Sequence, residues 1–460
     1  MNYRELQKNL LAPQSLLTDL SGQEGFFHDE TIYRGTPSAV LIVETKDDLV
    51  TAVQFCHRHK IPITTRGAGT GLSGGCVPSE GALVISTVKL NSLKIDPERK
   101  IAFCGPGVIT KTLQDEAARH GLTYPPDPAS YEESTLGGNV AENAGGLRCK
   151  RFGVTKDYVL GLEALTADGT LLKTGLYNDN RGFLLGDLLI ASEGTLAVIT
   201  EIAVRLIPLP ARGTTLLVTF DNPRKAAQTV SDIISAGIIP SVLEYIDGDA
   251  AECALAYEKT EGIDKKAAAI LLIETSDIDK ETQTSSIRHF CEKNGCLYLQ
   301  IEADPVKADS LWRVRRNVSN AAKAIAKLKI SEDVAVPISK FPLLVTFVSE
   351  MNRKSPLRIN SYGHAGDGNL HVNILSLGGD TEEMARIDEL VDRLLKKALQ
   401  LGGTISGEHG IGLAKREFLK YEFDPATLEA MRSIKSVFDP NGILNPKKLF
   451  PDRNLYPSTF

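Results

Sequence analysis

Two kinds of hydrophobic pattern alternate along this chain. Residues 38–43 and 61–66 are short apolar runs typical of strands, and the amphipathic stretch between them predicts a helix with Thr45 as its N-cap. Further short runs follow up to about residue 210, separated by glycine-rich loops, and Asp168-Gly169 predicts a hairpin turn between two of them. The first 210 residues therefore predict an α+β unit.

Beyond residue 210, strands and helices alternate more evenly. Residues 214–221, 267–276 and 296–303 are predicted strands, and amphipathic helical stretches separate them at 222–237 and 280–295. This rhythm is typical of a ferredoxin-like sheet with helices packed on one face.

The length of the chain predicts its division into domains. One hydrophobic core stops growing beyond roughly 250–300 residues, so a chain of 460 residues is expected to form at least two domains. We expect a first domain over residues 1–210, a second over residues 211–415, and a C-terminal segment, 416–460, that returns to the first domain.

Charge and cysteine spacing exclude several classes of protein. The formal net charge of −6 offers no basic surface for nucleic acid. The seven cysteines form no C-x-x-C pair for zinc or an iron–sulfur cluster, and they are typical of reduced thiols in a cytoplasmic protein. No apolar run approaches the roughly 20 residues of a membrane helix. Peripheral association with a membrane through a partner is left open, and so is a homodimer.

A glycine-rich loop at residues 65–75 is the first candidate for binding chemistry. It contains G-x-G-x-x-G at Gly69, Gly71 and Gly74. A Rossmann loop must open a helix, but the residues after Gly75 are rich in β-formers, so we expect this loop to join two strands. Backbone N–H groups of glycines can converge on an anion such as a pyrophosphate. The alternative is a merely flexible turn.

Two further segments favour a cofactor built from a ring and phosphates. Prolines stiffen residues 124–128 (YPPDP), and the glycines of residues 134–146 (STLGGNVAENAGG) allow close approach of backbone to a planar ring. Residues 191–200 (ASEGTLAVIT) end in a predicted strand that can present backbone groups to an adenine.

Taken in order, these motifs resemble those of a known family. RGAGTGLSGG, PPDP, TLGGNVAENAGG, FGVTKDYVLGLE and SEGTLAVITE resemble the FAD domain of the vanillyl-alcohol oxidase and p-cresol methylhydroxylase superfamily. Within it, the chain is similar over nearly its whole length to the branch that contains the glycolate oxidase FAD subunit, D-lactate dehydrogenases and D-2-hydroxyglutarate dehydrogenase. The resemblance implies a two-subdomain FAD-binding domain of p-cresol methylhydroxylase type, with a core over about residues 33–211, and an α+β substrate (cap) domain of the FAD-linked oxidase C-terminal type.

The same resemblance predicts how FAD is held. Some members of the superfamily attach it covalently through a histidine in the first glycine loop, which has none here, so non-covalent FAD is expected. The residues expected to bind FAD are Arg66, Gly67, Ala68, Gly69, Thr70, Gly71, Ser73, Gly74, Pro126, Asp127, Thr135, Gly138, Asn139, Asn143, Gly145, Gly146, Glu193, Gly194, Ile199 and Asn445.

A second set of candidate residues lies in two compact motifs, GHAGDGNLHVN at residues 363–373 and SGEHGIG at residues 406–412. His371 follows His364 by seven positions, which would place them on opposite faces of a regular strand, but the intervening Gly-Asp-Gly lets the chain bend so that the rings can converge. Asn373 shares a face with His371, and we count it with the catalytic residues.

Two imidazoles and a carboxylate are a recognised ligand set for a catalytic divalent metal. The resemblance implies the same ligands, His364, His371 and Glu408, for zinc, manganese or iron. The alternative is that these residues only bind substrate or flavin through hydrogen bonds. His409 is the expected general base, because imidazole titrates near neutrality. A structural capping role for His409 is the alternative.

Recognition of a substrate carboxylate favours arginine, which offers a planar pair of donors. Arg315 lies in a W-x-x-R phrase shared with the family and is the expected clamp, whereas Arg313 and Arg316 are typical of solvated helix charges. The 2-hydroxyglutarate enzymes carry a lysine near the position of Ser331. Its absence favours a monocarboxylic substrate.

Together these features predict the FAD-dependent oxidation of a small D-2-hydroxy acid to the 2-keto acid. His409 is expected to take the hydroxyl proton while the C2 hydride passes to flavin N5, which requires the C-terminal histidines to lie close to the flavin ring. Electrons are expected to leave to an iron–sulfur subunit, an electron-transferring flavoprotein or a quinone. The alternatives are an oxidase that uses oxygen, an aryl-alcohol oxidase, D-2-hydroxyglutarate dehydrogenase, and a flavin electron-relay subunit without a substrate of its own.

Overall fold

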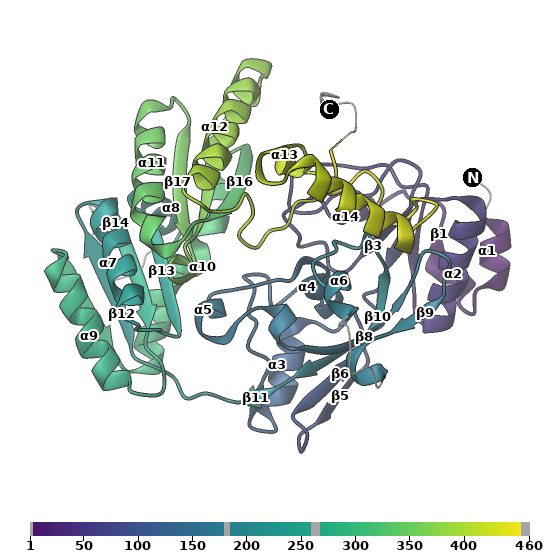
Figure 1. The fold of residues 1–460 in the computed structure, drawn as a ribbon, viewed down its shortest axis with the longest axis horizontal. Helices are drawn as coiled ribbons and strands as arrows, with labels where there is room; N and C mark the ends of the chain where they lie inside the picture. The colour runs from purple at the N-terminus through teal and green to yellow at the C-terminus, as the bar shows by residue number, and fades with distance from the viewer. Residues whose placement is uncertain (1–2, 179–184, 259–266, 452–460) are drawn as a thin grey trace. The chain divides into compact units, whose positions relative to one another are not determined.

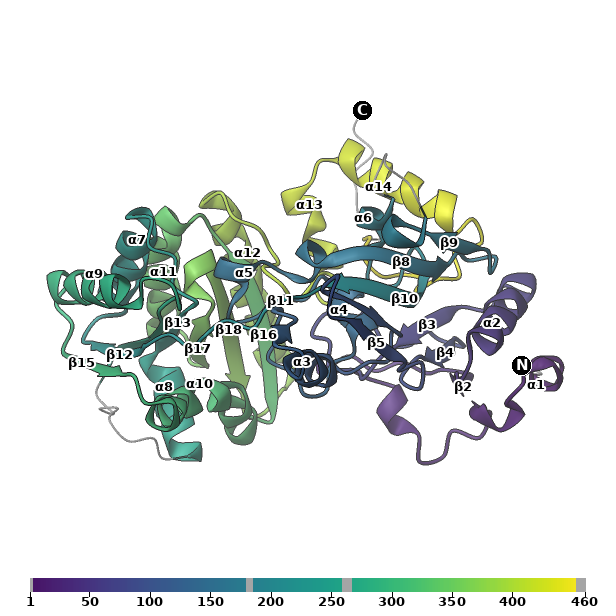
Figure 2. The same ribbon diagram turned by 90° about the horizontal axis from the view of Figure 1, so that it is seen from below.

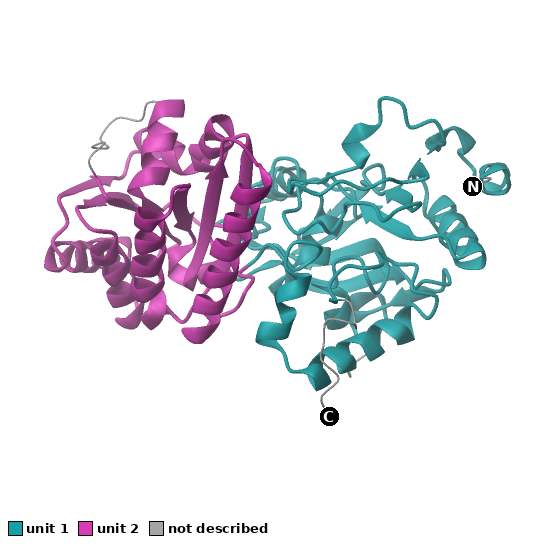
Figure 3. Ribbon diagram, turned by 90° about the horizontal axis from the view of Figure 1, so that it is seen from above, with its two compact units in different colours: residues 1–145, 153–209, 408–460 teal, residues 146–152, 210–407 magenta. Residues whose placement is uncertain are grey.

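The computed structural model describes residues 3–178, 185–258 and 267–451 (Figure 1). The chain forms two compact units, coloured separately in Figure 3. Unit 1 contains residues 1–145, 153–209 and 408–460, and unit 2 contains residues 146–152 and 210–407. Each unit therefore combines segments that are far apart in the sequence.

The first sheet of unit 1 has four strands in the order β1-β2-β4-β3. β2, β4 and β3 are parallel, and helix α2 provides the crossover from β2 to β3. Thr45 caps α2 as predicted, because its side chain accepts a hydrogen bond from Asp48 N. The elements are β1 (Leu16–Leu17), β2 (Ala39–Ile42), α2 (Lys46–His59), β3 (Ile63–Arg66) and β4 (Leu83–Ser86).

The second sheet of unit 1 is antiparallel, with the order β5-β6-β10-β8-β9. The predicted hairpin turn at Asp168-Gly169 joins β8 to β9, and Gly169 has a φ of 84° that favours glycine. The strands are β5 (Leu93–Asp96), β6 (Ile101–Cys104), β8 (Val159–Leu165), β9 (Leu171–Lys173) and β10 (Val198–Arg205), and a separate pair comprises β7 (Leu122–Thr123) and β11 (Ile207–Pro208).

The C-terminal segment packs against the first sheet. The backbone N–H of Ile63 on β3 donates to Ile443 O at 2.7 Å, and Asn445 N donates to Ile63 O at 2.8 Å, so residues 443–445 extend this sheet at its β3 edge. The helices of unit 1 besides α2 are α1 (Arg4–Asn9), α3 (Thr110–Ala118), α4 (Leu136–Glu142), α6 (Gly186–Leu189), α13 (Leu419–Glu422) and α14 (Pro425–Phe438).

Unit 2 is built on one antiparallel sheet of seven strands, in the order β15-β12-β14-β13-β17-β18-β16 (Figure 2). The strands are β12 (Thr215–Phe220), β13 (Val242–Asp247), β14 (Ala269–Glu274), β15 (Tyr298–Glu302), β16 (Leu328–Ala335), β17 (Arg358–Gly363) and β18 (Asn369–Ser376). The helices are α5 (Cys149–Phe152), α7 (Pro223–Ser235), α8 (Gly248–Tyr257), α9 (Lys280–Lys293), α10 (Pro305–Ile325), α11 (Phe341–Lys354) and α12 (Thr381–Gln400).

Helices cover both faces of this sheet, and the expectation that they cover one face was wrong. Neighbouring residues of β13 point to opposite faces. Ile246 packs into a core with α8 and α10, whereas the ring of Tyr245 contacts Phe341 of α11 with centroids 5.9 Å apart. The even spacing of apolar runs predicted the elements but carried no information about which face each helix covers.

Two further features bear on the chemistry of the chain. All seven cysteines are free thiols, and burial raises the pKa of Cys56 and Cys104 to about 12, which keeps them protonated. Among the described residues, no helix is long and apolar enough to span a membrane.

Candidate functional site

The first glycine loop connects two strands of the same sheet, β3 and β4, as expected, and opens no helix. Arg66 is buried at its start, where Nη1 donates to His28 O at 2.7 Å and lies 3.3 Å from Cys76 Sγ. A Cβ on Gly69, which has a φ of 84°, would lie 1.9 Å from Arg66 Nη2. Arg66 therefore supports the conformation of the loop, and position 69 requires glycine.

The second glycine segment packs closely against the first, with the Thr135 side chain beside Gly67. Thr135 caps α4 by accepting a hydrogen bond from Gly138 N at 3.4 Å. A Cβ on Gly67 would lie 2.1 Å from Thr135 Oγ1, and a Cβ on Gly137 would lie 2.7 Å from Pro106 Cβ. Position 67 can lie this close to Thr135, and position 137 this close to Pro106, only because neither position has a side chain.

These segments line a cavity within unit 1. Its walls are backbone and small side chains of the two glycine segments and of residues 192–199, together with Glu408 and His409. This lining suits an extended nucleotide cofactor, which needs backbone N–H groups for its phosphates and close, flat walls for its rings. Of the residues expected to bind FAD, those that line the cavity are Gly67, Ala68, Gly69, Thr70, Gly71, Thr135, Gly138, Asn139, Gly145, Glu193, Gly194 and Ile199.

The other expected residues lie outside this lining, and Asn445 and Ser73 among them hold its walls in place. Asn445 donates from Nδ2 to Gly75 O and to Glu193 O, both at 2.7 Å, and so ties two wall segments together. Ser73 O accepts hydrogen bonds from Leu413 N and Ala414 N, which anchors the C-terminal segment to the loop. The residues outside the lining are Arg66, Ser73, Gly74, Pro126, Asp127, Asn143, Gly146 and Asn445, and Gly146 belongs to unit 2.

Besides Glu408, the carboxylates of Glu142 and Glu193 line this cavity, and of these two only Glu193 was predicted from the sequence. Glu193 accepts a hydrogen bond from Ile411 N at 2.7 Å, and Glu142 Oε1 lies 3.4 Å from Ser73 Oγ. Burial raises the pKa of Glu193 to about 7. Burial, and then repulsion from Glu193, raises the pKa of Glu142 well above its ordinary value. In the sequence, Glu142 could have been identified as the acidic residue within the glycine-rich motif AENAGG.

A buried lysine lies near this pair. Lys448 Nζ donates to Gly75 O at 2.5 Å, Val77 O at 2.6 Å and Asn445 Oδ1 at 2.6 Å. Burial lowers the pKa of Lys448 to about 8. Its ammonium thus fixes the end of the glycine loop through carbonyl groups.

In unit 2, a hairpin brings the two histidines of the GHAGDGNLH motif together. β17 ends at Gly363, a short 3₁₀ turn over Ala365–Asp367 reverses the chain, and β18 pairs back so that His371 lies opposite Tyr362. The ring centroids of His364 and His371 are 5.3 Å apart with an interplanar angle of 90°. Both side chains are buried, so two ring nitrogens from this hairpin could serve one ligand. Glu408, the third expected metal ligand, and His409 belong to unit 1.

Glu244 of β13 contacts two of the predicted site residues. Its Oε1 lies 2.7 Å from His364 Nδ1, and its Oε2 accepts a hydrogen bond from Arg315 Nε at 2.5 Å. The Arg315 guanidinium also lies over the Tyr362 ring, 4.9 Å from its centroid. Glu244 was not among the predicted site residues, although an acidic residue in the middle of the apolar run VLEYID marked it in the sequence.

Asn373 is fully buried in β18 between its neighbouring strands. Its Nδ2 donates to Asn360 Oδ1 at 2.9 Å, and its Oδ1 accepts from Ser331 Oγ at 2.8 Å. On the same face of β16 as Ser331, Lys329 Nζ donates to Ser319 Oγ at 2.9 Å. This part of unit 2 therefore carries a polar cluster around Asn373 and two cations, Arg315 and Lys329.

Comparisons with known proteins agree on one family. Residues 37–175 match the model of a FAD binding domain, and residues 209–449 match the C-terminal domain of FAD linked oxidases. The glycolate oxidase subunit GlcD of Bacillus subtilis is 38% identical over 95% of this chain and 94% of its own, and the D-lactate dehydrogenase of Anaerostipes hadrus is 33% identical over 95% of each. A crystal structure of p-cresol methylhydroxylase with substrate bound superposes with a TM-score of 0.76 at 17% identity, covering 99% of this chain and 98% of the other. The structural similarity to p-cresol methylhydroxylase confirms the expected α+β fold class, with an FAD-binding domain of p-cresol methylhydroxylase type.

Proposed function

The chain belongs to the FAD-linked oxidases, and we propose that it uses non-covalently bound FAD to oxidise a small D-2-hydroxy acid, D-lactate or glycolate, to the 2-keto acid. Relatives named as a glycolate oxidase subunit and a D-lactate dehydrogenase support this substrate class. The observation that carries the proposal is the presence of His409 in the lining of the glycine-walled cavity of unit 1. An imidazole in the cofactor cavity is a suitable base for an alcohol.

FAD, when bound, supplies the acceptor for the hydride equivalent that leaves C2 of the substrate. The glycine segments of unit 1 bind it through backbone, and the first glycine loop contains no histidine for covalent attachment. His409 takes the hydroxyl proton.

The residues of unit 2 bind the substrate in this proposal. Arg315 holds the substrate carboxylate, for which a guanidinium has five N–H donors. Asn373 contributes through its place in the polar cluster of β18. A divalent cation held by His364, His371 and Glu408 would supply positive charge for the substrate oxygen, and the donor set of two imidazoles and one carboxylate suits zinc, manganese or iron.

A second candidate substrate carries another carboxylate, as D-2-hydroxyglutarate does. The sequence argument against it was the absence of a lysine at Ser331. Lys329 lies two residues earlier on the same face of β16 and is half-buried, so unit 2 does offer a second cation. This observation keeps dicarboxylic acids among the substrates to be tested.

The electron acceptor is proposed to be a separate molecule. The B. subtilis relative is named as a subunit, which supports a partner such as an iron–sulfur subunit, while an electron-transferring flavoprotein or a quinone suits the same chemistry. The cysteine spacing of this chain offers no iron–sulfur cluster of its own.

A panel of substrates tests the proposal. The purified protein is assayed with a dye acceptor and D- and L-lactate, glycolate and D-2-hydroxyglutarate. We expect turnover with D-lactate or glycolate and little with L-lactate. Absence of turnover with every 2-hydroxy acid, in protein that contains FAD, would overturn the proposed function.

A further inference from the structure

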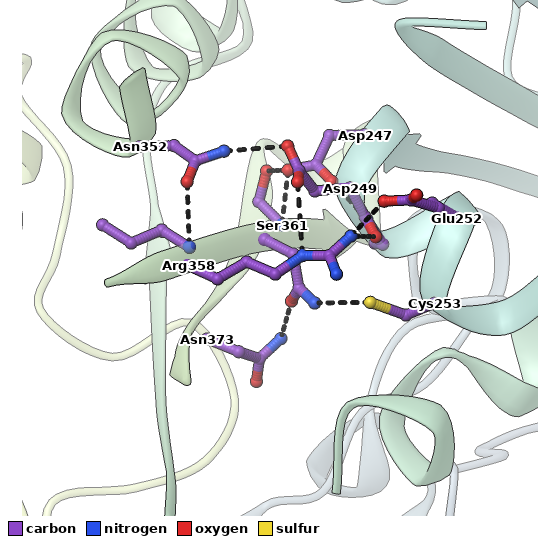
Figure 4. A network of polar contacts seen from close by, with 11 residues as sticks. Asp247, Asp249, Glu252, Cys253, Asn352, Arg358, Ser361 and Asn373 are labelled. Atoms are coloured by element: carbon purple, nitrogen blue, oxygen red, sulfur yellow. Dashed lines mark hydrogen bonds and ion pairs between the residues drawn. The ribbon is translucent and has the colours of Figure 1, made fainter. Parts of the chain in front are cut away.

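Strand β13 carries two buried acidic side chains whose surroundings differ. Asp247 caps helix α8 by accepting a hydrogen bond from Ala250 N at 2.8 Å, and its other oxygen accepts from Ser361 N at 2.5 Å and Ser361 Oγ at 2.7 Å (Figure 4). Burial raises the pKa of Asp247 to about 7. Its partners are a helix end and a neighbouring strand, so its role is to hold the fold together.

Glu244 lies three residues earlier and has no exposed surface. It shares a face of the sheet with Ile246, which packs with Leu217 and Leu272 in an apolar core. Burying a carboxylate there costs several kcal/mol unless both oxygens are paired. Both are paired, one with His364 and one with Arg315.

This pairing fixes which nitrogen of His364 carries a proton. An ionised carboxylate only accepts hydrogen bonds, so Nδ1 of His364 must be the donor at 2.7 Å. The neutral ring then keeps its lone pair on Nε2, which is the nitrogen able to bind a cation or accept a hydrogen bond. Glu244 thus determines both the tautomer and the orientation of the ring.

The same carboxylate orients Arg315. Its Oε2 holds Nε, and the Tyr362 ring covers the guanidinium from one face. With one edge and one face fixed, the direction of the terminal nitrogens is fixed as well. One side chain therefore sets the geometry of the predicted carboxylate clamp and of a predicted ligand histidine.

We propose that Glu244 is a positioning residue that holds His364 in the Nδ1-protonated tautomer and aligns Arg315 for the substrate carboxylate. The role in substrate binding rests on the proposed function, whereas the role in fixing the tautomer does not. Glu244 is proposed to act through these two residues without touching the substrate.

Glu244→Gln separates positioning from packing, because glutamine has the same shape but one acceptor oxygen and one NH₂ donor. It can accept from only one of the two partners. Because Arg315 Nε can only donate, the amide oxygen faces Arg315 and the NH₂ group faces His364, which favours the opposite tautomer, with the proton on Nε2. Asp247→Asn is the matched control, since it changes a buried carboxylate on the same strand that contacts neither residue.

The tautomer is measured by NMR of protein labelled with ¹⁵N-histidine, after treatment with a chelator, with a His364→Gln variant to assign the signals. We expect wild type and Asp247→Asn to show His364 protonated on Nδ1 only, and Glu244→Gln to show protonation on Nε2. A wild-type His364 with a proton on Nε2, or a tautomer unchanged in Glu244→Gln, overturns the proposal. This measurement needs no turnover, so its outcome is independent of the substrate panel.

Kinetics tests the part that concerns Arg315. With the substrate that the panel identifies, Glu244→Gln is expected to lower kcat/KM by about 10–100-fold, as loss of a supporting partner typically does, with a higher KM. Asp247→Asn is expected to lower Tm and leave kcat/KM unchanged. Equal losses of Tm in both variants with no change in kcat/KM would show that Glu244 is only structural.

Discussion

Glu142 and Glu193 each direct a carboxylate oxygen at the same point of unit 1. A Cβ added to Gly410 would lie 2.5 Å from Glu142 Oε2 and 2.9 Å from Glu193 Oε1. Within the described part of the chain, no ion pair joins either carboxylate to a lysine, arginine or histidine, although Lys448 and Lys415 are close enough to act at longer range. Two such groups cannot both ionise cheaply, so the pair is expected to hold a proton near neutral pH.

This pairing predicts a stability that falls as pH rises. The folded-state pKa values are raised above the ordinary 4.5, to about 7 for Glu193, so the folded protein binds more protons than the unfolded chain between these values. The stabilisation is complete below the unfolded pKa and is lost as pH rises through the folded pKa. From pH 4.5 to about 7, we expect the Glu193 shift alone to lower the free energy of unfolding by on the order of 3 kcal/mol.

The double variant Glu142→Gln/Glu193→Gln should weaken that pH dependence, because amides do not titrate, and leave the part that comes from Asp247. Thermal unfolding of the holoprotein at a series of pH values measures it. Glu133→Gln, which changes an exposed carboxylate, is the control and should behave as wild type. An unaltered pH profile in the double variant would contradict the account of this pair.

Gly137→Ala is expected to damage the cavity wall. Its Cβ would lie 2.7 Å from Pro106 Cβ and 2.9 Å from Pro106 O, so backbone must shift. Overpacking of this kind lowers the free energy of unfolding by about 1–3 kcal/mol. The displaced segment should also bind FAD more weakly. Flavin content and Tm of the purified variant check this, with Gly25→Ala as the control because its Cβ meets nothing within 4 Å. Full flavin content with an unchanged Tm would argue against the packing described.

The variant His409→Ala tests the proposed role of His409 as the general base that takes the hydroxyl proton of the substrate. We expect the variant to retain FAD, since other residues form most of the cavity lining, while kcat falls by roughly 10²–10⁴-fold, the usual contribution of a general base. His120→Ala, at an exposed position, should leave kcat unchanged. A variant at position 409 with near-normal turnover would rule out this role.

Removal of divalent cations tests the ligand set of His364, His371 and Glu408. If a cation takes part, chelation should lower kcat roughly 100-fold or more, since a cation contributes several kcal/mol of charge stabilisation. Added zinc or manganese should restore it, but not in His371→Ala. Activity that is indifferent to chelator would support the alternative in which these side chains only form hydrogen bonds.

The sequence predicted the features that depend on local signals. The Thr45 cap of α2, the turn at Asp168-Gly169 and a glycine loop that joins two strands follow from residues within a few positions of one another. The approach of His364 to His371 also follows from a short hairpin that a Gly-Asp-Gly bend permits.

The features that the sequence did not predict depend on distant contacts. Glu244 meets Arg315 across 71 positions and His364 across 120, and no local pattern identifies those partners. The helices on the second face of the sheet in unit 2 were missed for the same reason. Glu142 was overlooked because the glycines around it carried the motif, whereas its raised pKa arises from burial beside a carboxylate 51 residues away in the sequence.

The most direct test of the central claim is anaerobic mixing of the purified, FAD-containing protein with a 2-hydroxy acid while the absorbance of the flavin is followed. The account predicts that D-lactate or glycolate bleaches the oxidised flavin within the time of a turnover and that L-lactate leaves it oxidised. Flavin that remains oxidised with every D-2-hydroxy acid and with glycolate would contradict it.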